Sequence, residues 1–135
     1  MDISLQALEK TKSRLAEKTR GINFIVSDVR KLVSYEKFDL WHDRATFHFL
    51  TKIEDVEHYL SVAHKSLSDE GYLIISTFSK TGPDKCSGLE ICKYSETELK
   101  QLFGKYFENV RCFEDTHKTP WGSQQDFVYC GFKKR

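Results

Sequence analysis

Hydrophobic residues recur at helical spacing in three parts of the chain and predict three helices. Ser4 fits the N-cap of the first helix, and Gly21 follows its end. Ser95 and Glu98 form the pattern of a capping box at the start of the third helix, in which each satisfies a backbone amide. The predicted helices span residues 5–19, 53–67 and about 95–106.

Short apolar runs predict five strands, at residues 22–26, 38–42, 72–78, 110–115 and 127–132. The run 72–78, Tyr-Leu-Ile-Ile-Ser-Thr-Phe, is predominantly apolar, which is typical of a strand buried on both faces. Strands and helices alternate through the middle of the chain, and this order predicts parallel strands joined by right-handed crossovers. The last two strands have no helix between them and should form an antiparallel hairpin at one edge. The pattern therefore predicts an α/β fold.

A polar cluster, His42-Asp43-Arg44, separates the strand that begins at Phe38 from a second apolar run, 47–50. Ionisable side chains between hydrophobic runs are costly to bury unless they pair or form part of a site. In an open α/β sheet, ligands bind at the carboxyl ends of strands, and the cluster lies at such an end. We therefore take it as a candidate site, with a charged surface turn as the alternative.

Length and charge limit the class of protein. A chain of 135 residues fits a single domain, residues 1–135. The formal net charge of +1 argues against nucleic acid or an anionic membrane as the main partner. No apolar run approaches the roughly 18 residues of a membrane span, and no signal peptide is recognisable, so we expect a cytoplasmic location.

The four cysteines show neither CxxC pairing nor a histidine at zinc-ligand spacing. We therefore expect no metal site and no disulfide framework, with reduced thiols as in a cytosolic protein. Cys112 and Cys130 lie in strand-like runs and are predicted in the core, whereas Cys86 is predicted in a loop.

The order of elements and two long phrases resemble a class I S-adenosylmethionine-dependent methyltransferase. The phrases are Phe38-Asp-Leu-Trp-His-Asp-Arg-Ala-Thr-Phe-His-Phe-Leu-Thr51 and Thr119-Pro-Trp-Gly-Ser-Gln-Gln-Asp-Phe-Val-Tyr-Cys-Gly-Phe132. The resemblance implies a Rossmann-like methyltransferase sheet, mostly parallel, with a C-terminal antiparallel hairpin. It also implies that the family's first two strands and its GxGxG loop, which precede the position of Asp2, are lacking in this N-terminally truncated domain.

The resemblance assigns the cofactor-binding positions. Asp2, with Ile3, matches the site of the ribose hydroxyls, which a carboxylate accepts in a bidentate bond. Ser27-Asp28-Val29 matches the adenine side. The alternatives are a helix N-terminal charge for Asp2 and a simple turn residue for Asp28.

The remaining positions lie on the methyl and acceptor side. Asp43 and Arg44 match the methionine part of the cofactor, and His48 and Trp121 would lie nearer the acceptor. The candidate catalytic bases are His42, Asp43 and His48. As alternatives, His48 is a core histidine and Trp121 a hydrophobic plug in the hairpin.

Loss of the family's first two strands would bare the inner edge of the strand at 38–42, and such an edge invites pairing. We therefore expect a homo-oligomer, a swapped element, or a missing N-terminal segment. The resemblance implies transfer of a methyl group from S-adenosyl-L-methionine to a small-molecule or protein acceptor. The alternative function is a degenerate module that oligomerises or binds a partner without catalysis.

Overall fold

The computed structural model describes residues 1–135, which divide into two compact units, Met1–Ser34 and Tyr35–Arg135. The single domain expected from the length stays a prediction.

The first unit contains one α-helix and two short 3-10 helices: α1 (Leu5–Leu15), η1 (Ala16–Thr19) and η2 (Val29–Lys31). Ser4 caps α1 as predicted, because its Oγ accepts from the amide of Ala7 (3.2 Å). The helix ends earlier than predicted, where Ala16 has a positive φ of 48°.

The strand predicted at 22–26 is wrong. The segment makes only one isolated parallel bridge, between Val26 and Asp2. A strand needs a neighbour along its length, and the bridge in this unit involves only the short run around Asp2.

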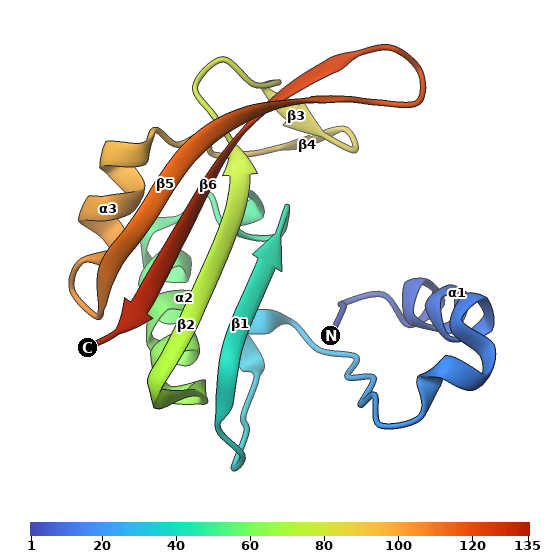
Figure 1. Ribbon diagram of the computed structural model, residues 1–135. Helices are drawn as coiled ribbons and strands as arrows, with labels where there is room; N and C mark the ends of the chain where they lie inside the picture. Colours follow the sequence, from blue (N-terminus) through green and yellow to red (C-terminus); the bar gives the residue numbers. More distant parts are fainter. The chain divides into compact units, whose positions relative to one another are not determined.

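The second unit is built on a four-stranded sheet in the order β1-β2-β6-β5 (Figure 1). The strands are β1 (Phe38–Arg44), β2 (Leu67–Phe78), β5 (Phe107–Lys118) and β6 (Gln124–Lys134). The α/β class and the antiparallel hairpin at one edge are confirmed. The sheet differs from the expected mostly parallel one. Only β1 and β2 pair in parallel, because 22–26 does not join and β6 inserts antiparallel between β2 and β5.

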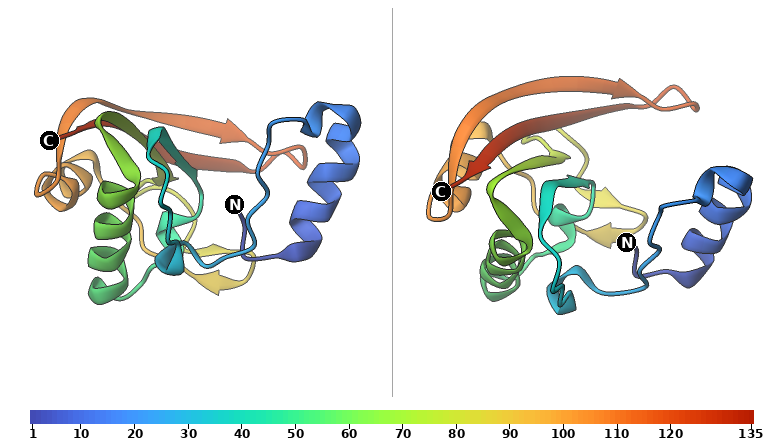
Figure 2. Two further views of the ribbon diagram at one scale, coloured as in Figure 1. Left: turned by 90° about the horizontal axis from the view of Figure 1, so that it is seen from below. Right: turned by 60° about the horizontal axis from the view of Figure 1, so that its bottom comes forward.

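Two helices, α2 (Ile53–Ser66) and α3 (Glu96–Phe103), cover one face of this sheet (Figure 1 and Figure 2). The capping box of α3 is confirmed: Glu98 accepts from the amide of Ser95 (2.7 Å), and Ser95 Oγ accepts from the amide of Glu98 (3.3 Å). The core between helices and sheet is rich in aromatic rings. Its largest fully buried side chains include Tyr59, Phe47, Phe78, Phe103, Phe107 and Phe132.

Short elements complete the unit: η3 (Phe47–Phe49) after β1, and a hairpin of β3 (Lys85–Cys86) and β4 (Leu89–Glu90). This hairpin was not predicted. Its turn residues, Ser87 and Gly88, both have positive φ, as a tight two-residue hairpin turn requires. No helix is long and apolar enough to cross a membrane.

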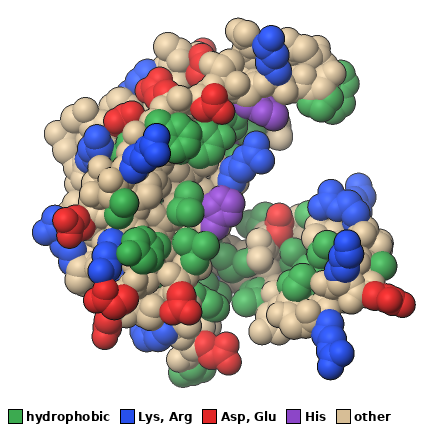
Figure 3. Space-filling view, viewed as in Figure 1, with side chains coloured by type: hydrophobic (Ala, Val, Ile, Leu, Met, Phe, Trp, Pro, Cys, Tyr) green, Lys and Arg blue, Asp and Glu red, His purple; other side chains and the backbone are tan.

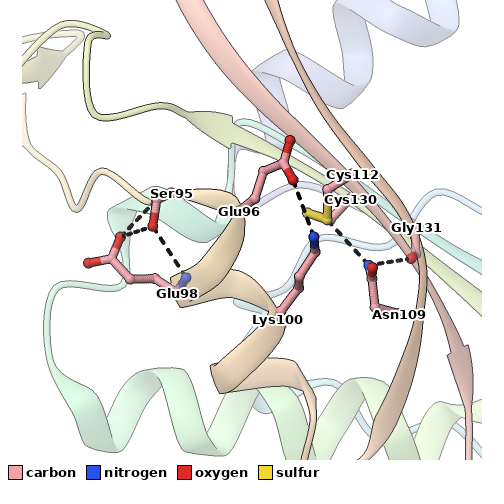
Figure 4. Close-up of a disulfide and its surroundings, with 8 residues drawn as sticks. All are labelled: Ser95, Glu96, Glu98, Lys100, Asn109, Cys112, Cys130 and Gly131. Atoms are coloured by element: carbon pink, nitrogen blue, oxygen red, sulfur yellow. Dashed lines mark hydrogen bonds and ion pairs between the residues drawn. A yellow bond between two sulfur atoms is a disulfide. The ribbon is translucent and has the colours of Figure 1, made fainter.

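The expectation of reduced thiols is wrong for two of the four cysteines, because Cys112 and Cys130 form a disulfide (Figure 4). They lie directly opposite each other on β5 and β6, with their Cα atoms 4.2 Å apart. Cys130 is buried as predicted, whereas Cys112 is half-buried. Cys86 and Cys92 are free.

Reduction of this disulfide is expected to lower the free energy of unfolding by about 2 kcal/mol, since it closes an 18-residue separation. Urea unfolding with and without dithiothreitol measures the difference. A Cys112→Ser/Cys130→Ala variant is the control and should be insensitive to dithiothreitol. Equal unfolding curves for the wild type in both conditions would contradict the prediction.

The sheet face opposite the helices carries alternate residues of each strand. On β1 and β2 these include Leu40, Tyr72 and Ile74, which lie in adjacent register. All three are exposed. Figure 3 shows hydrophobic side chains gathered over these two strands.

Candidate functional site

The carboxylate of Asp43 is buried at the end of β1 and holds the turn that follows it. Its Oδ1 accepts from the amide of Thr46 (3.1 Å), and its Oδ2 accepts from the hydroxyl of Tyr59 on α2 (2.7 Å). Trp41 Nε1 donates to the same hydroxyl (2.9 Å). Strand alternation places Trp41 and Asp43 on the helix-covered face, where Tyr59 meets both.

Burial raises the pKa of Asp43, while the hydrogen bonds from Tyr59 and Thr46 oppose that rise. The raised pKa of Tyr59 has a matching cause, burial beside the Asp43 charge. Both oxygens of Asp43 thus have partners within the protein. The structure makes Asp43 a positioning residue for the turn, and its predicted cofactor contact and catalytic role stay predictions.

The turn after β1 passes through Ala45, whose φ is 62°. A residue with a Cβ rarely adopts this left-handed conformation, and such strain concentrates at functional sites. The amide of Ala45 donates to the carbonyl of Ser76 on β2 (2.9 Å), which fixes the turn against the neighbouring strand. Arg44 and His42 lie exposed on β1, alternating with the buried Trp41 and Asp43.

His48, on η3, is fully buried and stacks on Phe78 with the ring centroids 4.8 Å apart. Neither ring nitrogen has a hydrogen-bond partner. Burial lowers the pKa of His48 to about 4, so the imidazole is neutral at pH 7. The alternative that His48 is a core histidine agrees with its packing. It does not explain why both ring nitrogens lack a hydrogen-bond partner.

Two hydroxyls near the end of β2, Ser76 Oγ and Thr77 Oγ1, are also buried without a partner. Buried polar atoms are nearly always hydrogen-bonded, so each exception calls for an explanation. Sequence reasoning missed both residues. The available signal was the pair of hydroxyls inside the otherwise apolar run 72–78.

In the first unit, the structure brings Asp2 beside Ser27. The amide of Asp2 donates to the carbonyl of Ile25, and the amide of Ser27 donates to the carbonyl of Asp2, both at 3.0 Å. Asp2 is exposed, and its Oδ1 accepts from the amide of Ser4 (2.8 Å). Ile3 is also exposed.

Asp28 caps η2 and pairs with Arg30, whose amide donates to its Oδ1 (2.9 Å) and whose guanidinium contacts both oxygens. These hydrogen bonds lower the pKa of Asp28 to about 2. The next residue, Val29, is buried. The turn alternative thus describes Asp28 well, and its contact with adenine stays a prediction.

Trp121 lies in the turn between β5 and β6 and is 90% exposed. Gly122 has a φ of 82°, and its amide closes the turn on the carbonyl of Thr119 (2.9 Å). Trp121 is therefore an exposed tip rather than a hydrophobic plug. Its place near an acceptor stays a prediction.

The predicted residues therefore form two groups. Asp2, Ile3, Ser27, Asp28 and Val29 lie in the first unit, and the others lie in the second. Among the three predicted carboxylates, Asp2 is the exposed one and fits a pair of ribose hydroxyls. The unsatisfied atoms of His48 and Ser76 fit a polar group near the end of β2.

Comparison with known proteins places this geometry in context. A family model described as a methyltransferase domain matches residues 1–127. No curated protein sequence matches the chain.

Solved structures with the same fold include N-methyltransferase NodS from Bradyrhizobium japonicum WM9, in complex with S-adenosyl-L-homocysteine. It has a TM-score of 0.79 and 15% identity, over 98% of this chain and 64% of that chain. A second is an S-adenosylmethionine-dependent methyltransferase from Methanosarcina mazei, with a TM-score of 0.77 and 15% identity, over 98% of this chain and 79% of that chain.

A third is 1,6-didemethyltoxoflavin-N1-methyltransferase from Burkholderia thailandensis. It has a TM-score of 0.70 and 20% identity, over 94% of this chain and 56% of that chain. The Rossmann-like methyltransferase fold is thereby confirmed. The chain spans about two thirds of the length of NodS and just over half of the toxoflavin enzyme.

Proposed function

The chain belongs to the class I S-adenosylmethionine-dependent methyltransferase family, and on that premise we propose that it binds S-adenosyl-L-methionine and serves in methyl transfer. The acceptor class we propose is a small molecule or a protein, because the net charge of +1 offers no general attraction for nucleic acid.

The observation that carries the proposal is a set of buried polar atoms without partners, on His48 of η3 and on Ser76 of β2, the residue whose carbonyl accepts from the amide of the strained turn residue Ala45. This group lies where the parallel strands β1 and β2 end. Ligands bind at that end of open α/β sheets. A bound polar group there would supply the hydrogen bonds that these atoms lack.

The proposed cofactor supplies an electrophilic methyl group. In this chain, Asp2 would accept the ribose hydroxyls, and Asp43 would act through Thr46 and Tyr59 to keep the turn in one geometry. Catalysis of this kind depends mainly on positioning the acceptor. His48 is a weak base because of its lowered pKa, so it is suited to orient a donor group on the acceptor.

Calorimetric titration of the full chain with S-adenosyl-L-homocysteine tests cofactor binding. The wild type is expected to bind in the micromolar range. Asp2→Ala should weaken binding about tenfold, since a bidentate bond to two hydroxyls is lost. Glu9→Ala is the control, because Glu9 is an exposed residue of the same unit that pairs only with Lys12. Absence of heat at millimolar ligand would overturn the proposal.

A second candidate function is a partner-binding module without catalysis. The observation that favours it is that both oxygens of Asp43, one of the candidate catalytic bases, already have partners within the protein, on Thr46 and Tyr59. The same titration separates the two functions. A module of this kind would give no heat with the wild type or with Asp2→Ala.

A further inference from the structure

The ring of His48 is closed off from solvent by its own unit. The side chain is fully buried, and neither ring nitrogen has a hydrogen-bond partner. A neutral imidazole carries one N–H donor and one acceptor nitrogen. A group that both accepts and donates, such as a hydroxyl, an amine or an amide, would satisfy the two nitrogens. Such a group reaches the ring only after a covering segment has moved.

Three neighbours contact His48 and limit what can move. The ring centroids of Phe78 and Phe49 lie 4.8 and 4.5 Å from that of His48. The amide of Cys92 donates to the carbonyl of His48 (2.8 Å). Phe78 ends β2 and Phe49 belongs to η3, and both elements contain fully buried side chains. Cys92 belongs instead to the segment between β2 and α3.

This segment, residues 80–93, is called the strap below. None of its side chains is buried, whereas those of Ser79 and Tyr94, which flank it, are. The strap leaves β2 and returns beside it, since the amide of Tyr94 donates to the carbonyl of Phe78 (3.0 Å). Between these ends it forms the β3–β4 hairpin, past the end of β2 (Figure 1). A segment without buried side chains opens at a low free-energy cost, so the strap is the neighbour of His48 that moves most readily.

The side chain of Lys80 holds the strap closed. Its Nζ donates to the carbonyl of Lys93 (3.0 Å), which joins the two ends of the strap. The same ammonium pairs with Glu98 Oε1 on α3 (2.7 Å). Glu98 is itself fixed, because its Oε2 accepts from the amide and the hydroxyl of Ser95. One ammonium group therefore ties both ends of the strap to α3.

We propose that the strap is a movable cover of the acceptor site, which opens to admit a hydroxyl, amine or amide group to His48 and closes again through Lys80. What enters rests on the proposed methyl transfer, whereas the opening does not. The strap, His48 and Glu98 all lie in the second unit. Closure over a bound acceptor would also keep water away from the reacting groups.

Chemical modification of His48 in the full chain measures the opening. The probe is diethyl pyrocarbonate, and peptide mass spectrometry gives the rate at each histidine. In the wild type His48 should react far more slowly than the exposed His117. Lys80→Gln should raise the rate at His48 about fivefold, since an ion pair and a hydrogen bond are lost. Lys100→Gln is the matched control, because it breaks an ion pair with Glu96 within α3, and it should leave the rate unchanged.

Two further measurements separate opening of the strap from general loosening of the unit. In amide hydrogen exchange, Lys80→Gln should speed the exchange of the Cys92 amide and leave that of Leu99, which donates to Ser95 within α3, unchanged. Salt screens an exposed ion pair. The modification rate of His48 should therefore rise with ionic strength in the wild type and not in Lys80→Gln.

The proposal is overturned if His48 reacts as fast as His117 in the wild type, or if it reacts equally slowly in Lys80→Gln. Equal acceleration of exchange at Cys92 and Leu99 also overturns it, because the whole unit would then loosen. Titration with S-adenosyl-L-homocysteine keeps the two proposals apart. Binding with an unchanged rate at His48 overturns the strap alone, and a raised rate without binding overturns the proposed methyl transfer alone.

Discussion

Tyr59→Phe is expected to lower the free energy of unfolding by about 4 kcal/mol at pH 7. The substitution keeps the ring and removes one oxygen. That oxygen donates to Asp43 Oδ2 and accepts from Trp41 Nε1, so its loss leaves a buried carboxylate oxygen and a buried indole without partners. Urea unfolding measures the change.

Tyr106→Phe is the control, because Tyr106 is half-buried and its contacts are made through its ring. It should change the free energy by less than about 0.5 kcal/mol. Asp43 has a raised pKa, so its native carboxyl takes up a proton before the unfolded one as the pH falls. The loss of unfolding free energy caused by Tyr59→Phe should therefore become smaller as the pH falls. A similar loss of unfolding free energy in Tyr59→Phe and Tyr106→Phe would contradict a stabilising role for the hydrogen bonds that join Tyr59 to Asp43 and Trp41.

The second large effect concerns His48. Its pKa is lowered to about 4 in the folded protein, against 6.5 for the free side chain. The neutral imidazole therefore contributes stability that is fully present above pH 6.5 and is lost as the pH falls toward 4. The loss amounts to about 3 kcal/mol, at 1.36 kcal/mol for each pH unit.

His48→Phe should remove this part of the acid sensitivity, because phenylalanine keeps the stacking on Phe78 and cannot take up a proton. Unfolding curves from pH 7 to pH 4 measure the difference between the variant and the wild type. His58→Gln is the control, as His58 is exposed on α2. Parallel pH profiles for His48→Phe and the wild type would show that His48 titrates freely.

Local sequence signals predicted well the elements that depend on near neighbours. The capping box at Ser95 and Glu98 and the C-terminal hairpin are formed as expected, because each is specified by residues close in the chain. The strand at 22–26 failed for the opposite reason. Its apolar residues suit a strand, but a ladder requires a neighbour that local pattern cannot supply.

The sequence predicted where the candidate site residues lie better than it predicted what their side chains contact. The sequence indicated that Asp43 lies at the end of a strand, but its partner Tyr59 comes from α2, sixteen residues away. The pairing of Cys112 with Cys130 depended similarly on the register of β5 and β6. The spacing of cysteines along the sequence can indicate a metal site or a disulfide-rich fold. It does not show which cysteines face each other across two paired strands.

The two tryptophans of the chain lie in opposite surroundings: Trp41 is 9% exposed and hydrogen-bonded inside the network of Asp43, whereas Trp121 is 90% exposed at a hairpin tip. The intrinsic emission of the folded protein is therefore a sum of two separable signals. An aqueous quencher such as iodide reaches Trp121 first, and the emission that survives comes from Trp41. The chain thus contains its own optical probe of the turn after β1, with no label attached.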